Sequence, residues 1–338
     1  MQSRPLARLL AAFLCVVAVP ARADAVADFY RGKVINLYIG INVGGSYDIQ
    51  ARMIARYIGA HIPGNPAIVP QNMVGAGGLT MANYLEGVAP RDGTAMGMMA
   101  NTLVPFQAVS APGVKFDAGR MNWIGSMESP ADVIVAWAAS GVKSAADLRA
   151  RDVSIAASAR GAITYIIPSM LNEFAGARFK IVTGYQGSPS MNLAMERGEV
   201  DAIVNSWPSL SAVKPEWFSG KTAAIIARTA SKRPDLQSFP MIGSLATNAE
   251  DRQVMELVLG GNPLGRPLAF PRDVPADRVK AIRDAFDAAM KDPAFREEAA
   301  RAGYDLEPTP GEELQRLVAR VLATPKHIAD RARPIIAP

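Results

Sequence analysis

Apolar residues follow two different periods along this chain. Short apolar runs rich in valine and isoleucine alternate with segments in which apolar residues recur every three or four positions. The runs predict strands at residues 34–41, 67–71, 94–99, 132–137, 153–157, 179–183, 201–204 and 222–227. Because helical segments separate these strands, we expect an α/β fold with mostly parallel sheets flanked by helices.

Three of the helical segments are well marked. Residues 47–62 place their larger apolar side chains on one face, namely Ile49, Met53, Ile54, Tyr57, Ile58 and Ile62. Pro275 suits the first position of a second helix, whose apolar stripe ends before Pro293. A third helix is expected to begin at Thr309, since Thr309 and Glu312 form a capping-box pattern. These features belong to the scaffold.

The first 23 residues have the layout of a secretory signal peptide. Arg4 and Arg8 precede an apolar run at residues 9–19, and Ala21-Arg22-Ala23 supplies the small-residue cleavage pattern. A membrane anchor is the alternative, but this run is too short to cross about 30 Å of hydrocarbon. We therefore expect cleavage after Ala23 and export to the bacterial periplasm.

Loss of this leader changes the composition of the mature chain. Cys15 is the only cysteine, so the mature chain can form no disulfide and has no thiol chemistry. The net charge falls from +5 to about +2, because Arg4, Arg8 and Arg22 are removed. No block of like charges follows, which argues against nucleic acid as a partner. No later apolar run approaches the length of a membrane span, so stable membrane insertion is not expected.

A mature chain of about 315 residues usually divides into two lobes. Proline and glycine concentrate between Gly261 and Pro271, where we expect the chain to cross back between lobes. A first crossing is expected around residues 123–130. Lobe one would then hold residues 24–127 and 263–338 with both termini, and lobe two would hold residues 128–262.

Two glycine-rich loops follow the first two predicted strands. The first contains Gly44, Gly45, Ser46, Tyr47 and Asp48, and the second contains Gly75, Ala76, Gly77 and Gly78. In a parallel sheet these loops lie at one edge, where free helix N-terminal amides suit a carboxylate. The alternative is that tight strand-to-helix turns need glycine for conformational reasons alone. A dinucleotide fingerprint fails because Thr80 stands where a third glycine or alanine is required.

Several short motifs follow one another along the chain. They are Gly44-Gly45-Ser46-Tyr47-Asp48 with Ala51-Arg52, Pro63-Gly64-Asn65-Pro66, Gln71-Asn72-Met73 with Gly75-Ala76-Gly77-Gly78, Ala82-Asn83-Tyr84-Leu85, Asp92-Gly93-Thr94, Gly184-Tyr185-Gln186-Gly187-Ser188, Glu196-Arg197-Gly198-Glu199-Val200-Asp201 and Asp292-Pro293-Ala294-Phe295. In this order and spacing, the chain resembles the solute receptors of tripartite tricarboxylate transporters, or Bug proteins. The resemblance covers nearly the whole mature chain.

This resemblance implies a two-lobed, periplasmic-binding-protein-like Venus flytrap that closes on a small carboxylic acid. The acid is expected to be a di- or tricarboxylate or an aromatic acid, held by main-chain amides and waters of the two glycine loops. Asp48 would cap amides, orient water or compensate the helix dipole. The partners would be integral-membrane transporter subunits. A receptor that opens and closes is expected to be monomeric.

Residues that follow the strands of lobe two are also expected in the site. Ser158, Arg160 and Thr164 lie in a strand-to-helix turn, where Arg160 could clamp a carboxylate or face solvent. Tyr185 would wall the cleft or pack in the core, Gly187 is a further candidate for ligand binding, and Ser188 would cap the helix that follows. Two further candidates, Asn205 and Trp207, follow another strand; Trp207 could stack on an aromatic acid or simply pack in the core.

Enzymatic chemistry finds little support. His61 and His327 are the only histidines, and neither has a metal-ligand partner at a suitable spacing, so no metal or cofactor is expected. A secreted hydrolase using Ser46 would place His61 about 22 Å away along one helix. We therefore expect no catalytic residues. A sensor that reports ligand occupancy to a membrane kinase would share this fold and stays open as an alternative.

Overall fold

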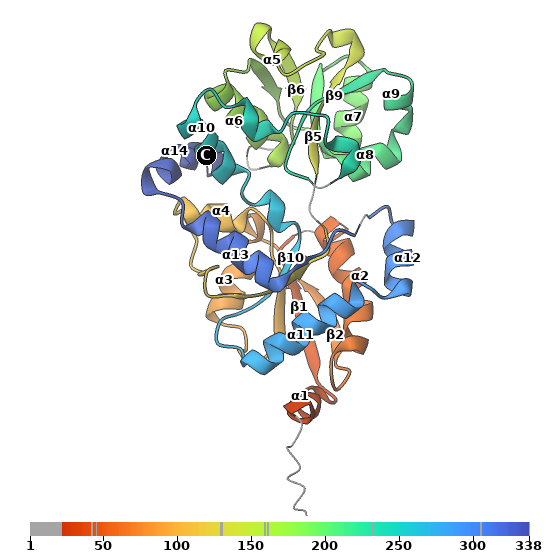
Figure 1. The fold of residues 1–338 in the computed structure, drawn as a ribbon, viewed down its shortest axis with the longest axis vertical. Coiled ribbons are helices and arrows are strands. Elements are labelled where there is room, and N and C mark those ends of the chain that lie inside the picture. The colour runs from red at the N-terminus through yellow and green to blue at the C-terminus, as the bar shows by residue number, and fades with distance from the viewer. Residues whose placement is uncertain are drawn as a thin grey trace, which may run out of the picture.

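The chain forms two α/β lobes, stacked one above the other in Figure 1. The computed structural model describes residues 22–41, 43–44, 46–128, 131–158, 160, 162–231, 233–304 and 306–337. The expected leader lies outside these residues except for Arg22 and Ala23, which begin helix α1 (Arg22–Tyr30). None of the helices in the described ranges has the length and apolarity of a membrane span.

The sheet of lobe one has the strand order β11-β4-β10-β3-β1-β2. These strands are β1 (Val34–Ile39), β2 (Ala67–Asn72), β3 (Ala95–Met98), β4 (Asn122–Ser126), β10 (Pro267–Phe270) and β11 (Thr309–Pro310). β2 and β3 flank β1 in parallel, whereas β10 is antiparallel to both β3 and β4. The strand β11 adds a short antiparallel pairing to β4.

The sheet of lobe two has the strand order β7-β6-β8-β5-β9. It consists of β5 (Asp132–Trp137), β6 (Val153–Ala156), β7 (Phe179–Val182), β8 (Ala202–Ser206) and β9 (Ala223–Arg228). β6 pairs in parallel with β7 and β8, while β5 is antiparallel to β8 and β9. All eight strands expected from the sequence are present, with ends that differ by at most two residues.

The two-lobed α/β expectation is confirmed, but both sheets are mixed rather than mostly parallel. β4, β5 and β10 carry the chain between the lobes, and of these β5 and β10 run against the parallel strands of their sheets. The sequence pattern missed β4 and β10 because both lie in segments interpreted as crossings. Pro267 is tolerated since it opens β10 rather than interrupting it.

Helices cover both faces of each sheet, as Figure 1 shows. Lobe one is flanked by α2 (Ser46–His61), α11 (Ala276–Ala289) and α12 (Pro293–Arg301) on one side, and by α3 (Leu79–Gly87), α4 (Leu103–Ala108) and α13 (Gly311–Leu322) on the other. Lobe two has α6 (Ile163–Ala175), α10 (Ala249–Val258) and α14 (Lys326–Ile336) on one face and α7 (Ser188–Glu196), α8 (Trp207–Val213) and α9 (Pro215–Ser219) on the other. The short α5 (Asp147–Ala150) precedes β6.

Side-chain alternation along the strands builds these layers. Ile35, Leu37 and Ile39 of β1 enter the core beneath α2 and α11, whereas Tyr38 faces the core beneath α3. In lobe two, Ile134 and Val135 of β5 likewise contribute to opposite cores. Each sheet is therefore buried on both faces, which is why its strands appeared in the sequence as continuous apolar runs.

The predicted helix at residues 47–62 is confirmed as α2, and the helix after Pro275 is confirmed as α11. The capping-box prediction is wrong. Thr309 lies in β11 and pairs with Ser126 of β4, so α13 begins only at Gly311. The close approach to β4 also explains that glycine, because a Cβ on Gly311 would lie 2.3 Å from the carbonyl oxygen of Trp123.

The C-terminal helix departs from the expected lobe boundaries. α14 packs against α10 and α6 of lobe two, where Ile328, Ala332 and Ile336 join the core. The chain thus crosses between lobes a third time after α13, which packs on β4 and α4 of lobe one. Residues 326–336 are therefore part of lobe two's packing, because α6 and α10 leave an apolar face that α14 covers.

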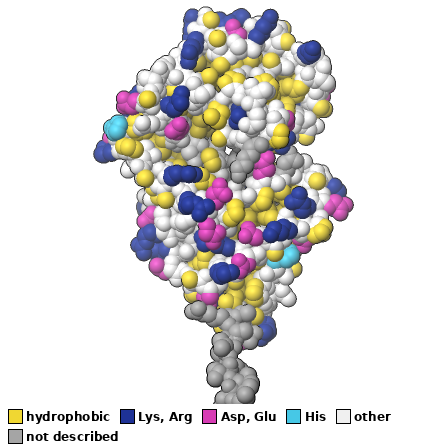
Figure 2. Space-filling model, in the orientation of Figure 1, with side chains coloured by type: hydrophobic (Ala, Val, Ile, Leu, Met, Phe, Trp, Pro, Cys, Tyr) yellow, Lys and Arg dark blue, Asp and Glu magenta, His cyan; other side chains and the backbone are white. Residues whose placement is uncertain are grey.

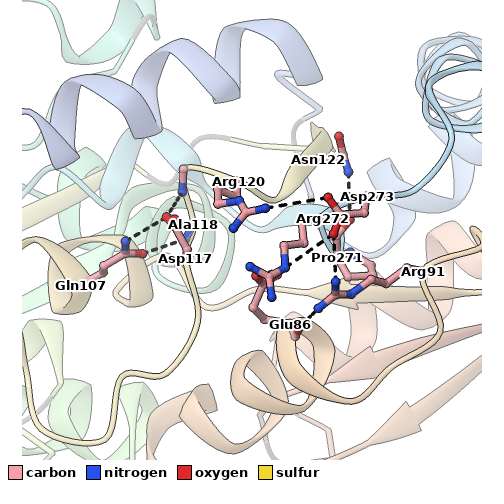
Figure 3. Close-up of polar contacts among 11 residues, drawn as sticks. Glu86, Arg91, Gln107, Asp117, Ala118, Arg120, Asn122, Pro271, Arg272 and Asp273 are labelled. Carbon is pink, nitrogen blue, oxygen red and sulfur yellow. Dashed lines mark hydrogen bonds and ion pairs between the residues drawn. The ribbon is translucent and has the colours of Figure 1, made fainter.

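An arginine-rich network closes the end of lobe one that lies at the amino ends of β1 and β3 (Figure 3). Arg272 pairs with the buried carboxylate of Glu86 at 3.1 Å, and Arg91 pairs with Asp273 at 2.9 Å. Asn122 donates a hydrogen bond to the carbonyl of Pro271 at 2.8 Å. These contacts fix the turn between β10 and α11 against α3. Elsewhere on the lobe-one face in Figure 2, basic and acidic side chains are interspersed.

Candidate functional site

The first glycine loop is organised by Asp48, which is buried at the start of α2. Its carboxylate accepts hydrogen bonds from the Gly44 amide, the Arg52 guanidinium and the Asn72 amide, each at 2.9 Å. Burial opposes ionisation, but these bonds outweigh it and hold the pKa of Asp48 below its usual range. The amide-capping role expected of Asp48 therefore fits its position. Gly45 lies outside the described residues.

The second glycine loop lies directly beside the first. Asn72 ends β2 and donates both to Asp48 and to the carbonyl of Ile41, at 3.1 Å, while Arg52 donates to Asn72 at 2.6 Å. These contacts join the ends of β1 and β2. The structure thus brings together the two loops that the sequence singled out, at the edge expected for a parallel sheet.

Gly75–Gly78 adopt backbone conformations that require glycine at several positions. Gly75, Gly77 and Gly78 have φ values of 155°, 64° and 99°, and even Ala76 has φ 46°. A Cβ on Gly75 would lie 2.3 Å from the hydroxyl of Thr80, whereas one on Gly77 would meet no atom within 4 Å. Gly77 is exposed, so its backbone is accessible to a ligand.

The lobe-two turn after β6 is closed by Ser158 and Thr164. The Ser158 amide donates to the Thr164 hydroxyl at 3.1 Å, and their hydroxyls lie 3.3 Å apart. Arg160 is exposed, and its guanidinium lies 5.9 Å from the ring centre of Tyr165. This placement fits the solvent-facing alternative for Arg160, and its proposed clamp on a carboxylate stays a prediction.

The turn after β7 meets the carboxyl end of β8. The Ser188 hydroxyl donates to the Asn205 side chain at 3.1 Å, and Asn205 donates to Asn192 at 3.1 Å. Ser188 is the first residue of α7, whose N-cap is Gly187, so the prediction that Ser188 caps this helix is wrong. Its hydroxyl instead joins the start of α7 to β8. Tyr185 is half-buried beside the core of lobe two.

Trp207 is part of the lobe-two core. Only 8% of the residue is exposed, its indole N–H donates to Asp235 at 2.7 Å, and its ring lies edge-on to Phe218 at 4.8 Å. These contacts occupy both the polar atom and the ring. The packing alternative for Trp207 therefore describes its position better than stacking on an aromatic ligand.

A cavity of about 160 Å³ lies between the lobes, beside the first glycine loop. Its polar lining comes from Tyr47, Asn101, Thr102 and Arg266 of lobe one and from Asp132 and Asn262 at the crossings. Of these lining residues, only Tyr47 was expected from the sequence to contact the ligand. An acidic residue opening an otherwise apolar strand was the available clue to Asp132, whereas nothing in the local pattern distinguished Arg266.

Arg266 joins the second crossing to the first loop. Its guanidinium forms an ion pair with Glu128 of the other crossing, donates to the Ser46 hydroxyl at 3.0 Å and lies 5.1 Å from the ring centre of Tyr47. Burial lowers the pKa of Arg266, against the opposing effect of Tyr47. The buried guanidinium near the site thus comes from the crossing and is already paired with a carboxylate.

Asp132 is the other charged group of the cavity. Burial raises the pKa of its carboxyl from about 3.8 to about 6, and the hydrogen bond from Asn262 only partly opposes this. Perturbed carboxyl groups that line a cavity are candidates for a functional role. The acid faces a chamber lined by both lobes, so it is placed to sense what the lobes enclose.

Metal and hydrolase sites find no support in the described ranges. There, no group of three histidine, cysteine, aspartate or glutamate side chains could hold a metal ion. His61 ends α2 and lies 3.1 Å from Asp292, at the opposite end of the helix from Ser46, and His327 is exposed. A nucleophile–base pair of Ser46 and His61 is therefore ruled out by geometry.

Two α/β lobes joined by crossing strands, with loops at strand ends gathered beside an interlobe cavity, define a two-lobed solute-binding protein. The model of the tripartite tricarboxylate transporter family receptor matches residues 51–332, and the chain belongs to this family. The resemblance found in the sequence motifs is thereby confirmed.

Individual relatives agree with this assignment. The chain is 26% identical over 308 residues to the Cupriavidus necator "UPF0065 protein in gbd 5'region", covering 88% of this chain and 85% of that protein. A TctC solute binding protein from Polaromonas has a similar fold, with a TM-score of 0.68, 17% identity and coverage of 89% and 99% of the two chains. An R. palustris protein solved with adipate gives a TM-score of 0.61 at 20% identity, covering 89% and 97%.

Proposed function

We propose that this protein is an exported periplasmic receptor that captures a small carboxylic acid between its lobes and delivers it to transporter subunits in the membrane. The observation that carries the proposal is the pairing of the two glycine loops through Asp48, Asn72 and Arg52. Membership of the receptor family supports delivery to a tripartite transporter. The adipate bound to the R. palustris relative supports an acid as the ligand.

The chemistry of the loops suits a carboxylate. The first-turn amides of α2 have no intrahelical acceptor, and they carry the positive end of the helix dipole. The second loop adds an accessible backbone at Gly77, where no side chain blocks approach. Asp48 keeps its own charge turned toward Arg52 and Asn72, which limits its repulsion of an anionic ligand. Backbone amides would thus bind the carboxylate with few charged side chains.

Closure of lobe two over the loops would complete the site. Ser158 and Asn205 lie at strand ends of that lobe, and Thr164 and Ser188 lie in the first turns of α6 and α7. All four offer hydroxyl or amide groups. A ligand shifts the equilibrium toward the closed form only if it binds that form more tightly. The closed form would then be the state that the membrane subunits recognise.

A thermal-shift and calorimetric screen of the mature chain, residues 24–338, tests this function. Mono-, di- and tricarboxylates, aromatic acids, amino acids, sugars and nucleotides should be compared. We expect a concentration-dependent rise of Tm with one class of carboxylic acid, because a ligand that binds the folded state stabilises it. A rise with sugars or nucleotides alone, or with none of these compounds, would contradict the proposal.

The second loop can be tested with a matched pair of variants. Gly77 and Gly176 have φ values of 64° and 67°, and neither would place a Cβ within 4 Å of another atom. Gly77→Val and Gly176→Val should therefore lose similar stability, on the order of 1 kcal/mol. Only Gly77→Val should weaken ligand binding, by tenfold or more. Equal affinities in the two variants would remove this loop from the site.

A further inference from the structure

We propose that the cavity between the lobes receives the end of the ligand remote from its carboxylate, and that Asp132 accepts a hydrogen bond from a hydroxyl or amino group there. This inference rests on the proposed function. It assigns the ligand to one class: a monocarboxylic acid with an apolar body and a hydrogen-bond donor at its far end.

The size and walls of the cavity favour an apolar body. Pro105 and Phe106 of α4 form one wall, Ile163 and Ile166 of α6 another, and Val258 and Ile336 of α10 and α14 a third. An apolar cavity of about 150 Å³ holds a benzene molecule. The chamber of about 160 Å³ therefore fits one ring or a chain of similar volume, with the carboxylate outside at the glycine loops.

Asp132 gives this largely apolar chamber a carboxylate. Only 7% of the residue is exposed, and one carboxylate oxygen accepts a hydrogen bond from the Asn262 side chain at 2.8 Å. Within the described ranges, no side chain or amide donates to the other carboxylate oxygen. A buried carboxylate with one donor is costly in free energy, and a ligand donor in the chamber would reduce that cost.

Arg266 and Tyr47, two of the neighbouring polar groups, are already engaged. The guanidinium of Arg266 pairs with Glu128, so it does not neutralise Asp132. The Tyr47 hydroxyl accepts from the Asn101 amide at 3.1 Å and donates to the Gly265 carbonyl at 3.4 Å. Asp132 therefore remains the charged acceptor of the chamber, whose other lining acceptors, such as Asn101 and Thr102, are neutral. A second carboxylate on the ligand would meet this negative charge, which disfavours dicarboxylates.

The simpler alternative is that Asp132 serves only to hold the crossings together. Its backbone amide donates to the Thr229 hydroxyl at 2.9 Å, and its side chain contacts Asn262 of the second crossing. Asp132→Asn separates the two roles. The new amide oxygen can still accept from Asn262, but the NH₂ group replaces the acceptor that faces the chamber.

The experiment measures affinities of matched acids for the mature wild-type chain and Asp132→Asn by calorimetry. The first set compares 4-hydroxybenzoate with benzoate and terephthalate, and the second compares 6-aminohexanoate with hexanoate and adipate. We expect the wild type to prefer the donor-bearing acid of at least one set by tenfold or more over both of its counterparts. Asp132→Asn should reduce that preference to threefold or less.

Asp251→Asn is the matched control, since Asp251 is a buried aspartate of the same lobe whose partners are Arg331, Thr247 and Asn248. It should leave the preference unchanged. Equal or tighter binding of adipate or terephthalate by the wild type would overturn the inference and leave the carboxylate receptor intact. So would an unchanged preference in Asp132→Asn. If no acid binds the wild type, the proposed function fails with it.

Discussion

Asn262 donates a hydrogen bond to the carboxylate of Asp132 at 2.8 Å, although 130 positions separate the two residues in sequence. The contact joins the first residue of β5 to the segment that leads into β10, so it ties the two crossings between the lobes. It also sets one wall of the interlobe cavity. A single buried acid thus lies where the two crossings meet the interlobe cavity.

The stability of Asp132→Asn should depend on pH. The pKa of Asp132 is raised to about 6 in the folded chain, so its burial destabilises the protein increasingly as pH rises from about 4 to about 6. At pH 7 the cost is on the order of 2–3 kcal/mol, from about 1.4 kcal/mol per pKa unit. Asp132→Asn should therefore unfold at higher urea concentrations at pH 7, with the difference vanishing toward pH 4. A pH-independent difference would contradict the raised pKa.

Asp251→Asn should have the opposite effect on the free energy of unfolding at pH 7. Burial opposes ionisation of Asp251, but hydrogen bonds from Thr247 and Arg331 prevail and lower its pKa. A carboxyl with a lowered pKa stabilises the fold above about pH 4, and this stabilisation is lost as pH falls. Asp251→Asn should therefore be less stable than the wild type at pH 7 and approach it in acid. Urea titrations across this pH range measure both variants together.

Asp48→Asn should weaken both the ligand site and the fold around it. The change removes the negative charge that pairs with Arg52 and alters the bonds from the Gly44 and Asn72 amides. Losing such a buried charged acceptor costs about 1–3 kcal/mol of unfolding free energy. Because both glycine loops shift when their link is lost, we expect tenfold weaker carboxylate binding by calorimetry. An unchanged affinity would show that Asp48 does not position the loops.

Gly75→Ala should destabilise the second loop through a steric clash. The added Cβ would lie 2.3 Å from the Thr80 hydroxyl, and φ at Gly75 is 155°. The expected loss is about 1–3 kcal/mol. Gly87→Ala is the control, because it ends helix α3 and its Cβ would meet no atom within 4 Å. If both variants melt at the same temperature, the conformation of Gly75 is not under this constraint.

Arg266→Ala and Arg160→Ala should behave very differently. Removing Arg266 leaves the Glu128 carboxylate largely buried and without its ion-pair partner, which typically costs about 3–5 kcal/mol. Arg160 is exposed, so its removal should change stability by less than about 0.5 kcal/mol and ligand affinity by less than threefold. Chemical denaturation and calorimetry report the two effects. A tenfold loss of affinity in Arg160→Ala would establish the clamp proposed for that residue.

Local sequence patterns were sufficient for much of the fold. The apolar runs that became β1 and β5 and the helical period of residues 47–62 depend on neighbouring residues, and each element formed close to its predicted ends. The patterns failed at β4 and β10, which are short and contain glycine or proline. Pairing with each other and with β3 makes these segments strands, and that pairing is not a local property.

The candidate site likewise has features that the sequence predicts and features that depend on long-range contacts. By itself the sequence determined the two glycine loops and the family resemblance, because conformational demands on glycine and motif order are visible along the chain. Only the tertiary structure decided that Thr309 extends a sheet, that Trp207 belongs to a core and that α14 packs on lobe two. It alone placed Asp132 against Asn262 and Arg266 against Glu128. These contacts arise because antiparallel pairing of β4 and β10 brings the two crossings together, and no periodicity in the sequence encodes that long-range pairing.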